Sequence, residues 1–154
     1  MKPFPSFPVA LALFLGFAPL QSAIAAPPAF SLDYPLLLSL SPPVPGFDYA
    51  LVAVTSHSSS PIAIQNPATF SDPAHFWDTQ AGSCWQQYEV FGNPIPPKNT
   101  CTIQVGFHSD DAGTFESTMT VYLCTAWHAD PVYNMIVCDA TGASQTIDVM
   151  GTAH

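Results

Sequence analysis

The sequence has few basic residues. Two lysines, Lys2 and Lys98, stand against eleven acidic residues in a chain of 154, and there is no arginine. The formal net charge is −9 at pH 7. Nucleic acids and anionic membrane surfaces attract proteins mainly through clustered lysine and arginine. The composition therefore excludes both as partners and predicts a strongly acidic protein.

Long hydrophobic runs are confined to the N-terminus. An apolar segment at residues 9–20 follows Lys2 and leads to the small residues Ala23-Ile24-Ala25. The segment is too short and too often interrupted by proline to cross a bilayer. We therefore predict a signal peptide at residues 1–25, no membrane span, and a mature domain that is secreted, periplasmic or at the cell surface.

Sustained helical periodicity is also absent, and glycine and proline punctuate the chain too often for a long helix. Several short segments alternate apolar and polar residues instead, as half-buried strands do. Residues 101–107 alternate in this way, and residues 115–123 resume the pattern after a turn at 109–113. We expect these two strands to form a hairpin. Residues 47–55 also alternate, and one face carries Phe47, Tyr49, Leu51, Ala53 and Thr55.

The segment at residues 26–46 is rich in proline but still patterned. Phe30, Leu32 and Tyr34 alternate with polar residues until Pro35 interrupts the run. Because proline in sheets belongs at edges and bends, we predict the first strand of the domain here, with a switch between sheets at Pro35. The alternative is a strand that adds to the open sheet edge of another subunit.

Four cysteines follow the predicted signal peptide, and they agree with export to an oxidising compartment. They allow two disulfides in three connectivities. Groups for familiar catalysis are missing, because the chain has no His-Glu-x-x-His, Cys-x-x-Cys or Gly-x-Ser-x-Gly motif. We expect neither an enzyme nor a bound cofactor.

The order of motifs from Cys84 to the C-terminus is similar to that of a known family. Cys84 precedes a proline-rich turn at 94–97, Cys101 opens the strand CTIQVGF, and AGTFESTMTVY and IDVMGTA follow. This order resembles the bacterial choice-of-anchor-D and ASPM-SPD-2-Hydin (ASH) group of immunoglobulin-like domains. The likeness covers residues 47–154. It departs from the group at Trp85–Asn93, at Ala153 in place of a final glycine, and in an insertion that carries Cys124 and Cys138.

The resemblance implies an all-β, immunoglobulin-like Greek-key β-sandwich over residues 47–154. Sequence order and the family pattern together favour the disulfides Cys84–Cys101 and Cys124–Cys138. Such domains are mostly non-catalytic scaffold or adhesion modules. We therefore predict a structural or adhesion module whose partner is another protein or a further copy of the chain, held through a sheet edge.

A copper centre is the alternative from another class of function. Blue-copper proteins bind their metal through one cysteine, two histidines and a weak methionine. The residues that match are His75 (or His57), Cys124, His128 and Met135. A cupredoxin-like electron carrier would need Cys124 as a thiolate, and a disulfide to Cys138 would remove it.

Aromatic residues cluster in sequence around the first cysteine. The cluster comprises Trp77, Trp85, Tyr88 and Phe91. Such rings either cover one end of the core or form a binding platform, since they bury large areas at low entropic cost. As a platform, they would take a carbohydrate or a protein partner.

Overall fold

A computed structural model describes residues 27–33, 39–40, 42–84, 94–130, 132 and 135–154. The predicted signal peptide lies outside these residues. The described residues form nine β-strands: β1 (Phe30–Asp33), β2 (Ser39–Leu40), β3 (Gly46–Ser56), β4 (Ala63–Ile64), β5 (Thr69–Phe70), β6 (Phe76–Asp78), β7 (Thr100–Ser109), β8 (Gly113–Asp130) and β9 (Met135–Ala153). This part of the chain contains no helix that is long and apolar enough to cross a membrane.

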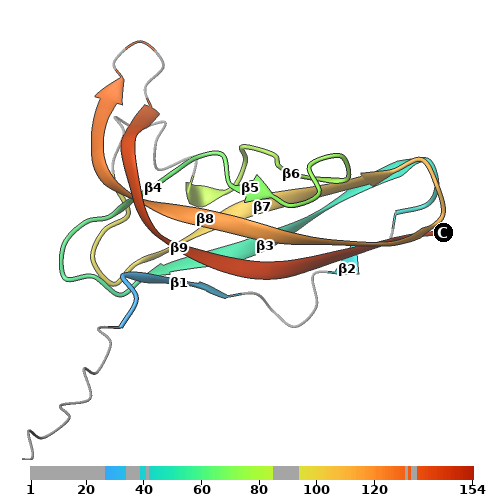
Figure 1. Cartoon of the computed structure of the whole chain (residues 1–154), viewed down its shortest axis with the longest axis horizontal. Helices are drawn as coiled ribbons and strands as arrows, with labels where there is room; N and C mark the ends of the chain where they lie inside the picture. The colour runs from blue at the N-terminus through green and yellow to red at the C-terminus, as the bar shows by residue number, and fades with distance from the viewer. Residues whose placement is uncertain (1–26, 34–38, 41, 85–93, 131, 133–134) are drawn as a thin grey trace, which may run out of the picture.

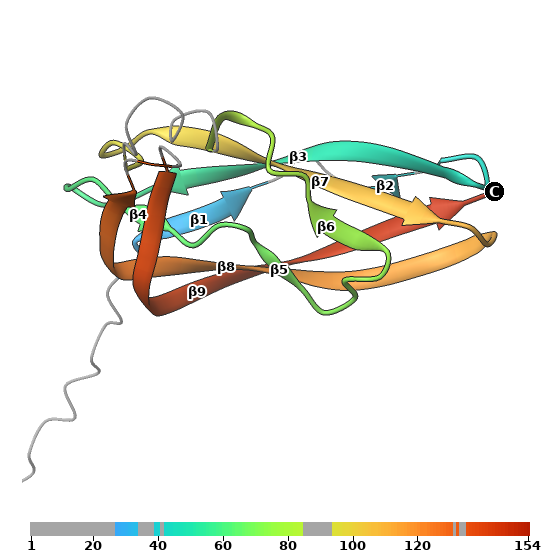
Figure 2. The ribbon, with the colours of Figure 1, turned by 90° about the horizontal axis from the view of Figure 1, so that it is seen from above.

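The strands form two sheets that pack face to face (Figures 1 and 2). The first sheet has the order β1-β3-β7-β6, and the second has the order β2-β9-β8-β4, with β5 also paired to β8. In the letters used for immunoglobulin domains, β1, β3, β7 and β6 correspond to strands A, B, E and D, and β9, β8 and β4 correspond to strands G, F and C. The ABED and GFC sheets are the arrangement of immunoglobulin domains. The predicted immunoglobulin-like sandwich is confirmed.

The N-terminal part of the domain contributes to both sheets. β1 pairs antiparallel with β3, from Phe30 opposite Ser56 to Asp33 opposite Ala53. β2 pairs in parallel with β9 in the second sheet, where Ser39 lies opposite Met150. The chain thus changes sheets between the two strands. Pro35, where we expected the change, lies outside the described residues.

The predicted hairpin of residues 101–107 and 115–123 is wrong. β7 pairs with β3 and β6 in the first sheet, whereas β8 pairs with β9, β4 and β5 in the second. The turn after Ser109 therefore carries the chain across the core. The apolar faces of the two strands meet there, with the rings of Phe107 and Phe115 5.8 Å apart. Alternation predicts a half-buried strand but not which sheet it joins.

The core lies between the sheets and follows the alternation of the long strands. The three apolar residues of β7, Ile103, Val105 and Phe107, are fully buried, as predicted. Opposite them in the second sheet, Met119 and Val121 are equally inaccessible. Burial of a large aliphatic or aromatic side chain contributes about 1.5–3 kcal/mol. This face of each strand therefore fixes how the sheets pack.

Both expected disulfides are present. Cys84 and Cys101 join at an S–S distance of 2.08 Å, and Cys124 and Cys138 join at 2.13 Å. The first bond lies in the core, where its cysteines are 0% and 1% exposed. Disulfides persist in oxidising compartments, so both bonds indicate an environment outside the cytoplasm.

β8 and β9 continue past the rest of the second sheet as a two-stranded hairpin, here called the arm (residues 125–130 and 135–141). In Figure 1 the arm turns away from the long axis of the sandwich. Its base contains register shifts between Tyr122 and Trp127. Such bulges bend a strand and increase its twist. The second disulfide joins the two strands there, which matters because an isolated hairpin is marginally stable.

Candidate functional site: the outward face of the first sheet

The outward side of β3 exposes large apolar side chains. Phe47, Tyr49 and Leu51 are 64%, 44% and 49% exposed. The alternate residues Val52 and Val54 are fully buried. The alternation predicted for this segment is real, but its more aromatic face points to solvent. The reason is the register with β7, which places Val52 opposite Ile103 on the core side.

Two neighbouring strands extend this exposed surface. Tyr49 lies opposite Gly106 of β7, and Gly106 lies opposite Trp77 of β6. The indole of Trp77 rests on Gly106, since a Cβ placed on the glycine would lie 2.4 Å from an indole carbon. We call the surface made by Phe47, Tyr49, Leu51 and Trp77 the apolar face.

Shape varies across the apolar face. The Phe47 and Tyr49 rings lie 5.7 Å apart and are tilted by 56°, so the side chains of β3 form a ridge. Beside the ridge, Gly106 has no side chain and only the flat indole covers it. On its far side, Trp77 borders a groove of 370 Å³ that is also lined by Pro67 and Phe70.

Hydroxyl and amide groups and one histidine border the apolar face. Thr79 Oγ1 donates to the Gln104 side-chain oxygen at 2.8 Å, and the Ser83 and Thr102 hydroxyls lie 3.2 Å apart. At the other end, His108 Nδ1 lies 2.8 Å from the Gly46 carbonyl oxygen. These bonds tie neighbouring segments of the first sheet together through hydroxyl, amide and imidazole groups.

Two carboxylates lie beyond the ends of the ridge, and a third, Asp48, is exposed within β3, where its Oδ1 accepts a hydrogen bond from Tyr49 N at 2.7 Å. Register places Asp33 of β1 beside Ala53, past Leu51. At the opposite end Asp110 is 3.3 Å from His108 Nε2. The outward surface of the second sheet differs, because Glu116 and Asp148 both line its 480 Å³ surface groove. The apolar face is thus weakly charged in an otherwise acidic chain.

The structure describes only one residue of the predicted aromatic platform. Trp77 belongs to the apolar face, while Trp85, Tyr88 and Phe91 lie outside the described residues. Sequence reasoning missed the β3 residues of the face. Their alternation was visible, but it did not indicate which of two apolar faces of the strand is buried.

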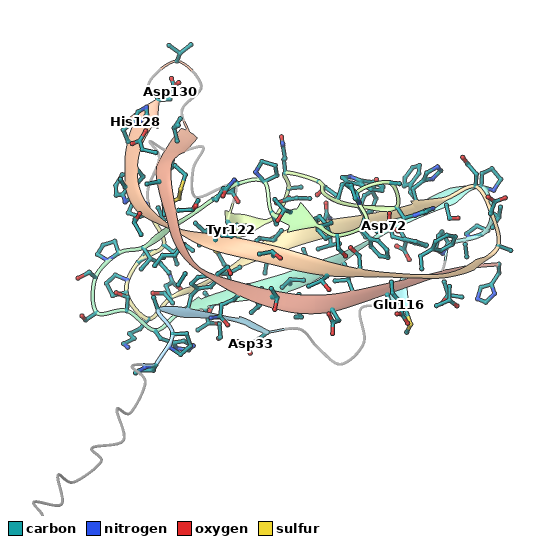
Figure 3. All side chains as sticks on the ribbon, in the orientation of Figure 1. Asp33, Asp72, Glu116, Tyr122, His128 and Asp130 are labelled. Carbon is teal, nitrogen blue, oxygen red and sulfur yellow. A yellow bond between two sulfur atoms is a disulfide. The ribbon has the colours of Figure 1, made fainter. Side chains whose placement is uncertain are left out.

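The ligands of the copper alternative are not arranged as a metal site. Cys124 is bonded to Cys138, which leaves no thiolate. His75 Nδ1 lies 2.8 Å from Asp72 Oδ2 in the turn before β6, and Figure 3 shows Asp72 far from His128 on the arm. Among the described residues, no group of three or more histidine, cysteine or acidic side chains is placed so that it could hold a metal ion.

The remaining candidates also have other neighbours. His128 Nδ1 lies 2.9 Å from both carboxylate oxygens of Asp139, its neighbour across the arm. His57 Nε2 lies 2.9 Å from the Ser31 hydroxyl. Met135 begins β9. The arm brings Met135 and His128 onto adjacent strands, but Cys124 is committed to its disulfide.

Comparisons with known proteins add little. No protein-family model and no curated protein matches the chain. It is similar to the ASH or PapD-like domain 7 of human CEP192, at a TM-score of 0.47 and 8% identity over 91% of this chain and 95% of that one. It is also similar to the VesB protease of Vibrio cholerae, at a TM-score of 0.46 and 12% identity over 81% of this chain. The chain spans 31% of the protease, and neither likeness informs on activity or ligand.

The seat of Trp77 on Gly106 gives a first testable prediction. In Gly106→Ala the new Cβ overlaps the indole, so Trp77 must leave the sheet surface. We expect a loss of about 1–3 kcal/mol in the free energy of unfolding, as for other overpacked sites. The matched control is Gly142→Ala, whose Cβ meets only the end of the exposed Thr125 side chain. Thermal melting of both variants checks this, and equal melting temperatures would contradict it.

Proposed function

We propose that this protein is an exported, non-catalytic module of the choice-of-anchor-D or ASH type, which acts in structure or adhesion by holding a protein partner on its apolar face. The observation that carries the proposal is a row of three large apolar side chains on one strand. Phe47, Tyr49 and Leu51 are each between 44% and 64% exposed. The order of motifs and the disulfide across the proline-rich turn, from Cys84 to Cys101, support the family assignment.

Contiguity distinguishes the apolar face from ordinary surface. Single exposed apolar residues are common and need no explanation. A contiguous patch beside polar residues, in contrast, is typical of interaction sites. Here the patch covers neighbouring strands and is bordered by Thr79, Gln104 and Thr102. We therefore assign it a protein partner, rather than a carbohydrate, because the tilted Phe47 and Tyr49 rings do not offer a flat surface to a sugar.

We also propose that the edge of β3 beside this face binds the partner by strand addition. β3 pairs with β7 from Gly46 to Thr55, but with β1 only from Ala53 to Ser56. No described strand pairs with its other edge between Gly46 and Val52. An added strand there would use backbone hydrogen bonds, with side chains adjoining the ridge, and the Tyr49 N–H would have to give up its present bond to Asp48 Oδ1.

The test is binding of the fluorescently labelled mature protein to the surface of the cells that produce it. We expect saturable binding that is lost in the double variant Phe47→Ser/Leu51→Ser. The double variant leaves the buried residues of the core unchanged, so the fold is kept. Val132→Ser is the matched control, because Val132 is 79% exposed but lies at the tip of the arm. Equal binding by the double variant and the wild type would overturn the proposal.

The copper alternative has its own readout. We expect no free thiol in the denatured, unreduced mature protein, because all four cysteines are paired. We also expect no blue colour on addition of Cu(II). One or two reactive thiols together with an intense visible band would favour the electron carrier instead.

A further inference from the structure

We propose that the partner of the apolar face is a second copy of this chain, bound face to face about a twofold axis. This rests on the proposed function and names its partner. Two sheets that pack in this way lie about 10 Å apart with their strands within about 30° of one another. A twofold arrangement closes on itself, since the same surface is used by both copies.

Charge is the first argument for a second copy. Two identical acidic chains repel each other, so they associate where carboxylates are fewest. The outward side chains of Phe47, Tyr49 and Leu51 and the adjoining Gln104 and Gly106 carry no carboxylate. Asp48 lies on the same strand, but its register opposite Phe107 places it on the other side, with its Oδ1 on Tyr49 N. The other outward surface places Glu116 beside Asp148, and the arm carries Asp139. Two copies that meet on the apolar face therefore bring fewer carboxylates together than two copies that meet on the outward surface of the second sheet.

Shape is the second argument. A ridge on β3 runs beside a low strip where the Trp77 indole covers Gly106. The two strips are neighbours, because Tyr49 lies opposite Gly106 in register. A twofold axis between them places the ridge of each copy over the low strip of the other. The face is thus complementary to itself.

The size of the face indicates which class of interface to expect. An aromatic side chain buries about 150–250 Å², and the four side chains are about half exposed or less except Phe47, which is 64% exposed. They therefore offer roughly 400 Å² of apolar area. Since homodimer interfaces are about 65% apolar, each copy would bury about 600 Å². The total of about 1,200 Å² is the lower end for a specific interface, so we expect a weak dimer.

Sedimentation velocity of the wild-type mature protein, from roughly 10 to 500 µM, tests the proposal. We expect a reversible monomer–dimer equilibrium within this concentration range. Added salt should tighten it by screening the repulsion between the two acidic chains. Phe47→Ser/Leu51→Ser should weaken it by about 30-fold or more, and Val132→Ser should leave it unchanged.

A cross-link tests the symmetry. Tyr49 is the centre of the ridge and lies beside the proposed axis, so its two copies are separated by little more than the spacing of the facing sheets, about 10 Å. Tyr49→Cys should form a covalent dimer with a bismaleimide that bridges about 10 Å, a separation too long for a direct disulfide, and the product should be visible on a denaturing gel. Val132→Cys, which is more exposed but lies on the arm, should remain monomeric at the same concentration.

The outcomes separate this proposal from the proposed function. A wild-type chain that stays monomeric at the highest concentration, or that grows beyond a dimer, overturns the twofold dimer. If the monomer still binds cells through Phe47 and Leu51, the proposed function stands and the partner is a different protein. If cell binding is also insensitive to these residues, both proposals fail.

Discussion

Deletion of residues 26–40 is expected to abolish cooperative folding. Phe30 is 1% exposed and packs in the core, while β1 and β2 each complete a sheet. Loss of a buried phenylalanine side chain alone costs about 3–5 kcal/mol. The stability of a typical domain is only about 5–15 kcal/mol. Circular dichroism during thermal denaturation should show no sharp transition.

A shorter deletion provides the control. A chain that begins at Ala29 loses Pro27 and Pro28, which are exposed, and it keeps the hydrogen bond from His57 N to the Ala29 carbonyl oxygen. It should melt like the intact mature protein. If deletion of residues 26–40 instead left the melting temperature unchanged and removed assemblies, the segment would belong to an interface between subunits.

The second large effect concerns the disulfides. Their loops are of similar length, with sequence separations of 17 and 14. Loop entropy alone assigns each about 3 kcal/mol. The structure predicts different contributions from the two bonds, because Cys84 and Cys101 lie in the core whereas Cys138 is half-buried on the arm. We expect the full cost from the first bond and a local effect from the second.

Paired alanine substitutions test this difference. Cys84→Ala/Cys101→Ala should lower the melting temperature by about 10 °C or more, from roughly 3 °C per kcal/mol at this size. Cys124→Ala/Cys138→Ala should change it by much less, because the arm opens without the sandwich. Limited proteolysis should then cut the arm first. Similar melting temperatures for the two double variants would contradict this expectation.

Sequence reasoning predicted features that depend on local pattern. The alternation after Cys101 identified a half-buried strand because its buried side is apolar and its other side is polar. The proline-rich turn between Cys84 and Cys101 made the first disulfide recognisable by family likeness. Both depend on residues that are close in the chain.

Sequence reasoning failed for features that are determined by pairing between strands far apart in the chain. The hairpin expected around Ser109 is a crossing between sheets, and alternation is identical in the two cases. The buried side of β3 was undetermined because Val52 and Leu51 are both apolar. Only pairing with β7 fixes that choice, and with it the apolar face. Of the predicted aromatic platform, only Trp77 falls among the described residues.

The strands also determine how the domain carries force. The described chain begins at one end of the long axis and its C-terminus lies at the other (Figure 1). β1 and β2 run along this axis beside β3 and β9. Tension between the ends therefore loads the hydrogen bonds of both pairs in shear, all at once, rather than breaking them one by one. The domain should resist stretching along this axis more strongly than pulling across its sheets, a useful property for a link between two surfaces.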